Sequence, residues 1–259
     1  MKYFFDSLEE INRKISGAKP LVLMFDFDCT LAPLSKSPKR SAFLRADTKH
    51  LLNKVSRKFE VAIITGRSLD NIKERVDMAG LMYAGSHGME WHVGKKPDSI
   101  TMDRKSEKSL ANIYKQFKKL KPKYPNLRVD DKKLCIGIGF KFIKKSLLDI
   151  FLAESDSIIN KAINEGLDII EEPTSFEFRP DIGWTKGEFA QYVIGHLKLK
   201  GSKQPLAIYV GDGITDEDAF RVLKNDITVR VEKDKNSAAQ YYIENQKEIN
   251  KFLKYILAL

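Results

Sequence analysis

Short apolar runs recur in the outer parts of this chain, and several of them end in polar side chains. They cover residues 21–27, 60–64, 81–84, 206–210 and 227–231. A continuous apolar run of this length is typical of a strand buried on both faces of a parallel sheet. We therefore expect the outer parts of the chain to contribute strands to one buried sheet.

Segments with the apolar spacing of helices alternate with these runs. They cover residues 3–16, 48–59, 68–78, 186–197, 216–223 and 248–257. Ser68 stands at the position of an N-cap, where a side-chain oxygen accepts a backbone N–H of the first turn. Strands that alternate with helices in this manner form βαβ units, so the pattern predicts an α/β core with a parallel sheet.

The middle of the chain follows a different order of elements. Helices over residues 105–120 and 146–164 are each followed by a pair of strand-length segments, 127–129 with 134–142 and 167–171 with 175–178. Asp130 and Asp131 are expected to join the first pair. This order predicts a smaller inserted α+β domain over residues 103–178, and it leaves residues 1–102 and 179–259 for the core.

Composition excludes several classes of protein. The chain has 259 residues, of which 42% are hydrophobic and 31% charged, and this balance is unlike that of disordered or fibrous chains. No apolar run approaches the roughly 18 residues of a membrane helix. The first residues lack the apolar stretch and cleavage site of a signal peptide. The spacing of Cys29 and Cys135 suggests no metal cage or disulfide framework, so a reducing cytoplasm is the expected location.

The chain is basic, with 45 Lys and Arg against 35 Asp and Glu, for a net charge of +10. Its densest run of lysines lies within residues 105–123 and has no aromatic interleaving typical of an RNA-binding motif. We interpret this run as a solvated face and expect no nucleic-acid partner. The alternative, a nucleic-acid binder, predicts binding that falls steeply with salt. A basic protein also attracts anionic substrates such as phosphate esters.

Three of the predicted strands end in clusters of polar residues. The clusters are Asp26 with Asp28 and Thr30, Thr65 with Gly66 and Arg67, and Asp212 with Asp216. Ligands of open α/β sheets bind outside the carboxyl ends of the strands, so we expect the clusters to converge on one crevice. A turn explains a single aspartate after a strand. It does not readily explain the same arrangement on two strands, with Lys186 between them in sequence.

This combination of residues suits hydrolysis of a phosphate monoester, which is very slow without a catalyst. Asp26 is the candidate nucleophile, because a carboxylate that attacks phosphorus forms an aspartyl phosphate and divides the reaction into two easier steps. Asp28 is the candidate general acid for the leaving alcohol and base for water. Thr65, the amide of Gly66 and Lys186 are expected to hold the phosphoryl oxygens.

A divalent cation is expected beside the nucleophile, because two anions must approach each other there. Mg²⁺ prefers oxygen ligands, which the carboxylates of Asp26, Asp28, Asp212 and Asp216 supply. The remaining members of the clusters, Thr30 and Arg67, are expected to contact the substrate.

Four segments resemble the motifs of the haloacid-dehalogenase-like hydrolases: FDFDCTLAPL, ITGRS, WTKG and GDGITDEDAF. Together with GSHGME and EFRP, they are similar to the trehalose-6-phosphate phosphatase family, in order from residue 21 to 220. The resemblance implies a Rossmann-like core with a mobile α+β cap, Mg²⁺, and hydrolysis of trehalose 6-phosphate to trehalose and phosphate in the cytoplasm. It also implies association with a trehalose-phosphate synthase.

The resemblance further implies residues that face the sugar or lie near the hinge of the cap. These are His87, Gly88, Glu90, Glu177 and Arg179.

Three positions depart from the family's usual pattern. Cys29 replaces a glycine, Gly213 replaces an acid, and the segment LCIGIGFK lacks His-Tyr-Arg, so that Lys141 or Lys133 is expected to substitute for the arginine. A lysine lacks the fork geometry of arginine. Two alternatives therefore stay open: a phosphatase of another sugar phosphate, of the sucrose or mannosylglycerate type, and an inactive regulatory relative that only binds a sugar phosphate.

Overall fold

The structure, a computed structural model, describes residues 1–17, 20–33, 42–201 and 203–259. The chain divides into two compact units, which we name the core unit (Met1–Ser99 with Trp184–Leu259) and the second unit (Ile100–Gly183). In the described ranges, none of the helices is long and apolar enough to cross a membrane.

The core unit is built on a mostly parallel sheet, as predicted. Its strands are β1 (Lys2–Tyr3), β2 (Leu21–Phe25), β3 (Glu60–Ile64), β4 (Met82–Gly85), β5 (Glu90–His92), β6 (Pro97–Ser99), β11 (Leu206–Gly211), β12 (Ile227–Val231) and β13 (Tyr241–Ile243). They lie in the order β1-β13-β12-β11-β2-β3-β4-β5-β6. All neighbouring pairs from β1 to β4 are parallel, and β5 and β6 are antiparallel additions at one edge.

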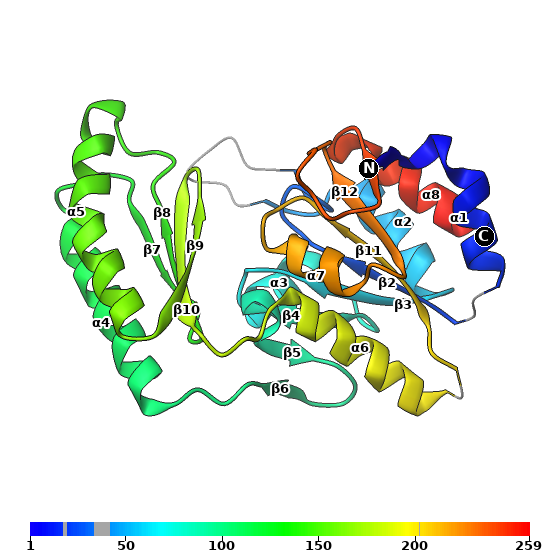
Figure 1. Ribbon diagram of the computed structural model, residues 1–259, viewed down its shortest axis with the longest axis horizontal. Coiled ribbons are helices and arrows are strands. Elements are labelled where there is room, and N and C mark those ends of the chain that lie inside the picture. The colour runs from blue at the N-terminus through cyan, green and yellow to red at the C-terminus, as the bar shows by residue number, and fades with distance from the viewer. Residues whose placement is uncertain (18–19, 34–41, 202) are drawn as a thin grey trace. The chain divides into compact units, whose positions relative to one another are not determined.

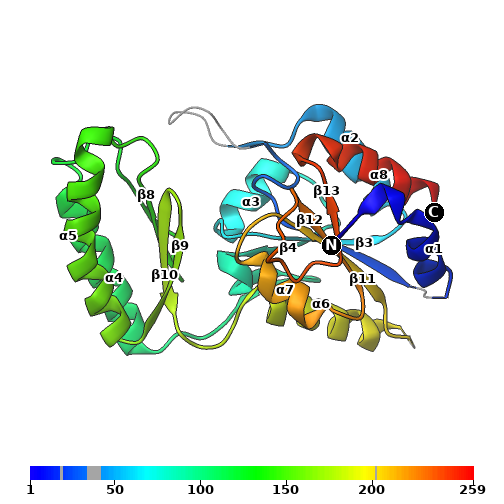
Figure 2. The same cartoon turned by 45° about the horizontal axis from the view of Figure 1, so that its top comes forward.

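Helices cover both faces of this sheet, which explains why every residue of β2 is buried. One face packs against α1 (Leu8–Ser16), α2 (Ala46–Ser56), α3 (Leu69–Val76) and α8 (Ile249–Ala258). The other face carries α6 (Lys186–Lys200) and α7 (Asp216–Val222) (Figures 1 and 2). Phe25 of β2 and Phe252 of α8 are fully buried between the first of these faces and its helices. Each contributes about 1.5–3 kcal/mol relative to an exposed ring.

The second unit is a two-layer α+β structure. An antiparallel sheet runs in the order β7 (Arg128–Asp131), β8 (Ile136–Gly139), β10 (Ser175–Pro180) and β9 (Leu167–Glu172). Helices α4 (Arg104–Leu120) and α5 (Lys145–Asn164) lie together on one side of it (Figure 1). In β10, Phe176 and Phe178 enter the apolar core, and Glu177 and Arg179 alternate with them on the other face.

The structure corrects several predicted boundaries. The strand predicted to Phe27 ends at Phe25, so that Asp26 already lies outside the ladder. The turn predicted at Asp130 and Asp131 is wrong, because both residues belong to β7. The chain instead turns between Lys132 and Cys135, where Lys133 has a φ of 71°.

The predicted N-terminal helix is divided into β1, a 3-10 turn at Phe4–Asp6 and α1. Short 3-10 turns also occur at Ser86–Gly88 and Gln246–Glu248. Strands β5, β6 and β13 were not expected. Each has three residues, too few to show an apolar alternation, and hydrogen bonding to a neighbouring strand defines them.

Candidate active site

The polar clusters of the core unit follow three adjacent strands. Strand β2 lies between β11 and β3, so Asp26 lies between the residues that follow those two strands. Asp26 and Thr65 are both buried, with 6% and 1% of their surfaces exposed. Carboxylate oxygens of Asp26, Asp212 and Asp216, which we name the acidic cluster, lie within 4.8 Å of one another.

Lys186 enters the acidic cluster from the first turn of α6. Thr185 is the N-cap of this helix, and its side chain and that of Glu188 form a capping box. Lys186 Nζ lies 2.7 Å from Asp26 Oδ1 and 2.8 Å from Asp216 Oδ1. Burial alone would lower the pKa of Lys186, but the carboxylates of Asp216 and Asp26 outweigh it and raise the pKa. The lysine is therefore a permanent cation in the site.

Asp216 accepts four hydrogen bonds from the core unit. Its Oδ1 accepts from Lys186 Nζ at 2.8 Å and from the Tyr209 hydroxyl at 2.7 Å. Its Oδ2 accepts from the backbone N–H groups of Asp212 at 3.1 Å and Gly213 at 2.9 Å. These bonds match the roughly four acceptor positions of a carboxylate. Asp216 thus fixes the loop after β11 and one side of Lys186.

The glycine before this loop is required by close packing. A Cβ on Gly211 would lie 2.3 Å from Asp216 Cγ, which no side chain could tolerate. A Cβ on Gly213 would meet Asp216 Oδ2 at 3.5 Å, an ordinary contact. The loop's hydrogen bonds to Asp216 come from the backbone N–H groups of Asp212 and Gly213, so they do not require an acid at residue 213.

The three carboxylates of the acidic cluster repel one another. Burial, followed by the charge of Asp216, raises the pKa of Asp26 well above its usual range despite the opposing charge of Lys186. Burial and Asp216 likewise raise the pKa of Asp212 to about 7, although the Thr30 hydroxyl donates to Asp212 Oδ1 at 2.9 Å. A hard divalent cation fits this set of oxygen donors, because it would offset the repulsion.

Asp28 lies in a separate ion pair. Arg67 Nε and Nη2 each lie 2.6 Å from an Asp28 oxygen in a bidentate contact, and Arg67 Nη1 donates to Asn71 at 3.1 Å. The structure therefore places Arg67, which we expected on the substrate, against the candidate acid–base residue. Asp28 is also outside the acidic cluster to which the sequence interpretation assigned it.

Residues 65–67, which we name the Thr65 loop, are packed against the GSHGME segment. The His87 ring lies so close to Gly66 that a Cβ there would be 2.6 Å from His87 Cε1. The His87 N–H donates to the Thr65 carbonyl at 2.9 Å. Glu90 accepts from the Ser86 hydroxyl at 2.8 Å and from the Leu69 N–H at 3.0 Å. His87 therefore supports the loop directly, and Glu90 joins Ser86 of the GSHGME segment to Leu69, which follows the loop.

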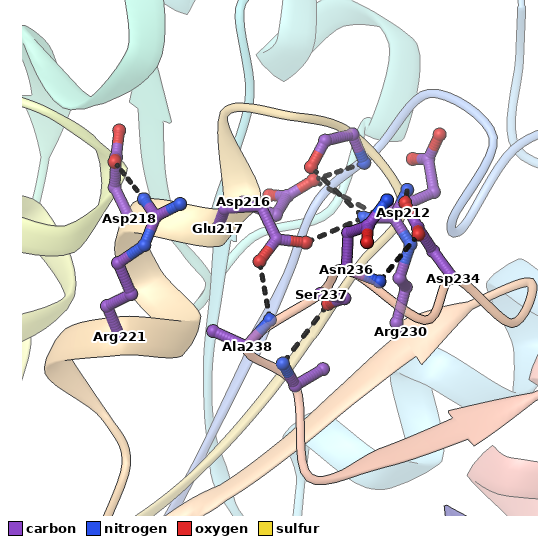
Figure 3. Close-up of polar contacts among 12 residues, drawn as sticks. Asp212, Asp216, Glu217, Asp218, Arg221, Arg230, Asp234, Asn236, Ser237 and Ala238 are labelled. Atoms are coloured by element: carbon purple, nitrogen blue, oxygen red, sulfur yellow. Dashed lines mark hydrogen bonds and ion pairs between the residues drawn. The ribbon is translucent and has the colours of Figure 1, made fainter. Parts of the chain in front are cut away.

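A second set of contacts, which the sequence interpretation missed, holds the first turn of α7, which directly follows the loop after β11. Glu217 accepts from Arg230 Nη1 at 2.9 Å and from the Ala238 N–H at 2.8 Å (Figure 3). Arg230 also lies 3.7 Å from Asp234. Tyr209 was missed as well, because it lies within an apolar run. A buried tyrosine hydroxyl requires a hydrogen-bond partner, so the tyrosine within this apolar run could have indicated a nearby acceptor.

Glu177 and Arg179 of the second unit, which were expected to face the sugar or lie near the hinge, each lie in an ion pair. Glu177 lies 2.6 Å from Lys132 Nζ and 2.9 Å from Cys135 Sγ. Arg179 donates to Asp168 at 2.7 Å. Lys141 is exposed, with its Nζ 5.8 Å from the centre of the Phe142 ring. The lysine that meets Glu177 is thus Lys132, which was not among the expected residues.

Comparisons with known proteins agree with this architecture. The family model described as trehalose-phosphatase matches residues 24–249. Probable trehalose-phosphate phosphatase D of Arabidopsis thaliana is 30% identical over 262 residues, covering 96% of this chain and 70% of the relative. Trehalose 6-phosphate phosphatase RA3 of Zea mays is 29% identical, covering 91% and 69% of the two chains.

Solved structures show the same fold. The C-terminal domain of the C. albicans trehalose-6-phosphate phosphatase superposes with a TM-score of 0.82 at 17% identity, covering 97% of this chain and 96% of that one. A trehalose-6-phosphate phosphatase related protein gives a TM-score of 0.74 at 22% identity, with 92% and 97% covered. The expected resemblance is confirmed: the chain belongs to the trehalose-phosphatase family, a group of phosphoric monoester hydrolases with the haloacid-dehalogenase-like fold.

Proposed function

We propose that this protein hydrolyses trehalose 6-phosphate to trehalose and phosphate in a Mg²⁺-dependent reaction through an aspartyl phosphate at Asp26. The position of Asp26 carries the proposal. Its buried carboxylate lies 2.7 Å from the ammonium group of Lys186 and within the acidic cluster, at the edge of the sheet where ligands of this fold class bind. Membership of the trehalose-phosphatase family supports the substrate.

The chemistry assigns a role to each residue around Asp26. Asp26 attacks phosphorus and becomes the aspartyl phosphate. Lys186 holds the Asp26 carboxylate and offsets the charge that gathers as the phosphoryl group arrives. The Thr65 hydroxyl and the Gly66 amide hold the phosphoryl oxygens. Asp28 gives a proton to the leaving sugar oxygen and later takes one from water, with Arg67 setting its orientation.

We assign the metal to two carboxylates rather than four. Asp26 and Asp212 are the proposed ligands, and Mg²⁺ would neutralise the nucleophile and the phosphoryl oxygens. The four donors around Asp216 already use its acceptor positions, so its proposed role is to anchor Lys186 and the loop. Asp28 is proposed as acid and base alone. The inactive-relative alternative, which Gly213 and Cys29 motivate, is the less favoured one because Asp26, Asp28, Thr65, Lys186 and Asp212 are all present.

The second unit is proposed to act as the cap that selects the sugar. The face of its sheet opposite α4 and α5 carries Lys132, Glu177 and Arg179, whose paired donors and acceptors suit sugar hydroxyls. Gly88 is assigned no sugar contact, because it packs against Phe189 and its carbonyl accepts a hydrogen bond from Trp184. Association with a trehalose-phosphate synthase and a cytoplasmic location complete the proposal.

A panel of sugar phosphates tests the substrate. Phosphate release would be measured from trehalose 6-phosphate, glucose 6-phosphate, and the sucrose and mannosylglycerate phosphates, with Mg²⁺ or with a chelator. We expect the highest kcat/KM for trehalose 6-phosphate, and no turnover with the chelator. A preference for another sugar would establish the alternative substrate. Lys132→Ala should raise KM for the preferred sugar, and Lys119→Ala, at an exposed position of α4, serves as its control.

A further inference from the structure

The turn formed by Ser86–Gly88, which we name the His87 turn, has an unfavourable backbone. Its three residues all have positive φ angles, of 48°, 59° and 95°. Only the last is glycine, and side chains disfavour this left-handed region. Such strain persists where the surrounding structure imposes it, and it concentrates at functional sites. The contacts that hold this turn therefore need an explanation.

One side of the His87 turn is fixed by the Thr65 loop. The Ser86 N–H donates to the Arg67 carbonyl at 2.7 Å, and the His87 N–H donates to the Thr65 carbonyl at 2.9 Å. The His87 ring covers Gly66 at the distance described above. Turn and loop are thus one packed unit, and a shift of the turn would move the groups proposed to bind the phosphoryl oxygens.

The other side of the turn is fixed by Trp184. Its indole Nε1 donates to the Gly88 carbonyl at 2.7 Å. A Cβ on Gly88 would lie 2.6 Å from Phe189 Cβ, so the turn also fits tightly against α6. Trp184 stacks on Trp91, with ring centres 5.7 Å apart and planes 20° apart. The indole is therefore immobilised, and its N–H is directed at the strained turn.

We infer that Trp184 is a positioning residue for phosphate binding, acting through the His87 turn on the Thr65 loop. The inference rests on the proposed function, because it assumes that the Thr65 loop binds the phosphoryl group. This role requires the indole N–H, which donates to the Gly88 carbonyl. A residue that served only to pack against Trp91 would not need a hydrogen-bond donor. Removing the N–H would release the Gly88 carbonyl and let the turn relax away from Gly66.

A comparison of two tryptophan variants tests the inference. Trp184→Phe keeps an aromatic ring on the stack and removes the donor, and Trp91→Phe makes the same change in ring size on the other partner. Binding of inorganic phosphate to the Mg²⁺-loaded protein would be measured by titration calorimetry, with kcat, KM and Tm for each variant. Trp184→Phe should weaken phosphate binding and raise KM by about tenfold, the effect of one lost hydrogen bond, with a smaller change in kcat.

The control distinguishes positioning from packing. Trp91→Phe should lower Tm as much as Trp184→Phe and leave phosphate affinity within about twofold of the wild type. Equal phosphate affinity in the two variants, or a Trp184→Phe effect confined to kcat, would overturn the inference. The second result would indicate a disturbance of the nearby Lys186. Failure of the wild type to hydrolyse trehalose 6-phosphate would instead refute the proposed function, and phosphate calorimetry would still test the role of Trp184.

Discussion

Asp216 shows how one buried side chain sets the positions of several others. Its two oxygens accept hydrogen bonds from a lysine, a tyrosine and two backbone amides. These four bonds fix the orientation of the carboxylate. Asp26, by contrast, is held by Lys186 through one oxygen. Residues of the same type thus take an anchoring role and a reactive role within one cluster, according to how many donors surround each.

Removal of the nucleophile should abolish turnover and leave the fold intact. Asp26→Asn has the same size and can still accept from Lys186, but its amide cannot attack phosphorus. We expect kcat to fall by a factor of about 10⁴ or more, with an unchanged circular dichroism spectrum. Asp156→Asn, an exposed position of α5, is the control and should keep full activity. Normal Mg²⁺-dependent turnover by Asp26→Asn would refute the mechanism.

The anchor and the proposed ligand should respond differently to substitution. Asp216→Asn replaces an acceptor with a donor and leaves Lys186 without one of its two charge partners, so it should lower the free energy of unfolding by about 3–5 kcal/mol. Asp212→Asn relieves repulsion and should cost little stability, but it should abolish Mg²⁺ binding. Denaturant unfolding and Mg²⁺ titration calorimetry separate the two. Retained Mg²⁺ affinity in Asp212→Asn would contradict the ligand assignment.

Cys29 occupies a position that favours glycine, with a φ of 59°. The departure from the family pattern at this position therefore carries a local conformational cost. Cys29→Gly should raise the free energy of unfolding by about 1 kcal/mol, since the left-handed region disfavours a Cβ. Cys29→Ala keeps the Cβ and should show no such gain in denaturant unfolding. Equal stabilities of the glycine and alanine variants would attribute the effect to the thiol.

At the scale of elements, helix starts and strand ends carry the site. Lys186 is the first residue of α6, and Asp26 and Thr65 directly follow strands. These elements were predictable because buried strands have a continuous apolar pattern, and β3 and β12 have the predicted bounds. The partners of the site residues were not predictable. The pairing of Arg67 with Asp28 and the four donors around Asp216 depend on tertiary packing, which a single sequence does not display.

The capping box of α6 should therefore affect catalysis as well as stability. Thr185→Ala removes the side-chain acceptor of the Gly187 N–H and should destabilise the protein by about 1 kcal/mol. Because the capped turn carries Lys186, kcat should fall too. Asp103→Ala removes the comparable cap of α4 and is the matched control, with a similar local cost but unchanged kcat. Equal kcat values in the two variants would show that the cap does not position Lys186.

At the scale of the whole molecule, burial of the acidic cluster couples folding to pH. The raised pKa of Asp212, about 7, means that the folded state keeps a proton that the unfolded state releases above its ordinary pKa near 3.8. The free energy of unfolding therefore falls as pH rises through this interval. The raised pKa of Asp26 acts in the same direction.

Thermal melts of metal-free protein test this coupling. Tm should be lower at about pH 8 than at about pH 6, because more carboxylate is forced to ionise in the folded state. Saturating Mg²⁺ should reduce the difference, since it binds only the folded cluster. Asp212→Asn should flatten the profile of the metal-free protein. A Tm that rises between these pH values without metal would contradict the assignment.

The stacked tryptophan pair has a practical consequence. Trp91 and Trp184 are the only two tryptophans in the sequence, and they lie face to face in the core unit. The tryptophan fluorescence of the protein therefore originates from this one pair of rings, which lies beside the turn that supports the Thr65 loop. An optical titration without any attached dye would report occupancy of the active site, provided that loop and turn move as one.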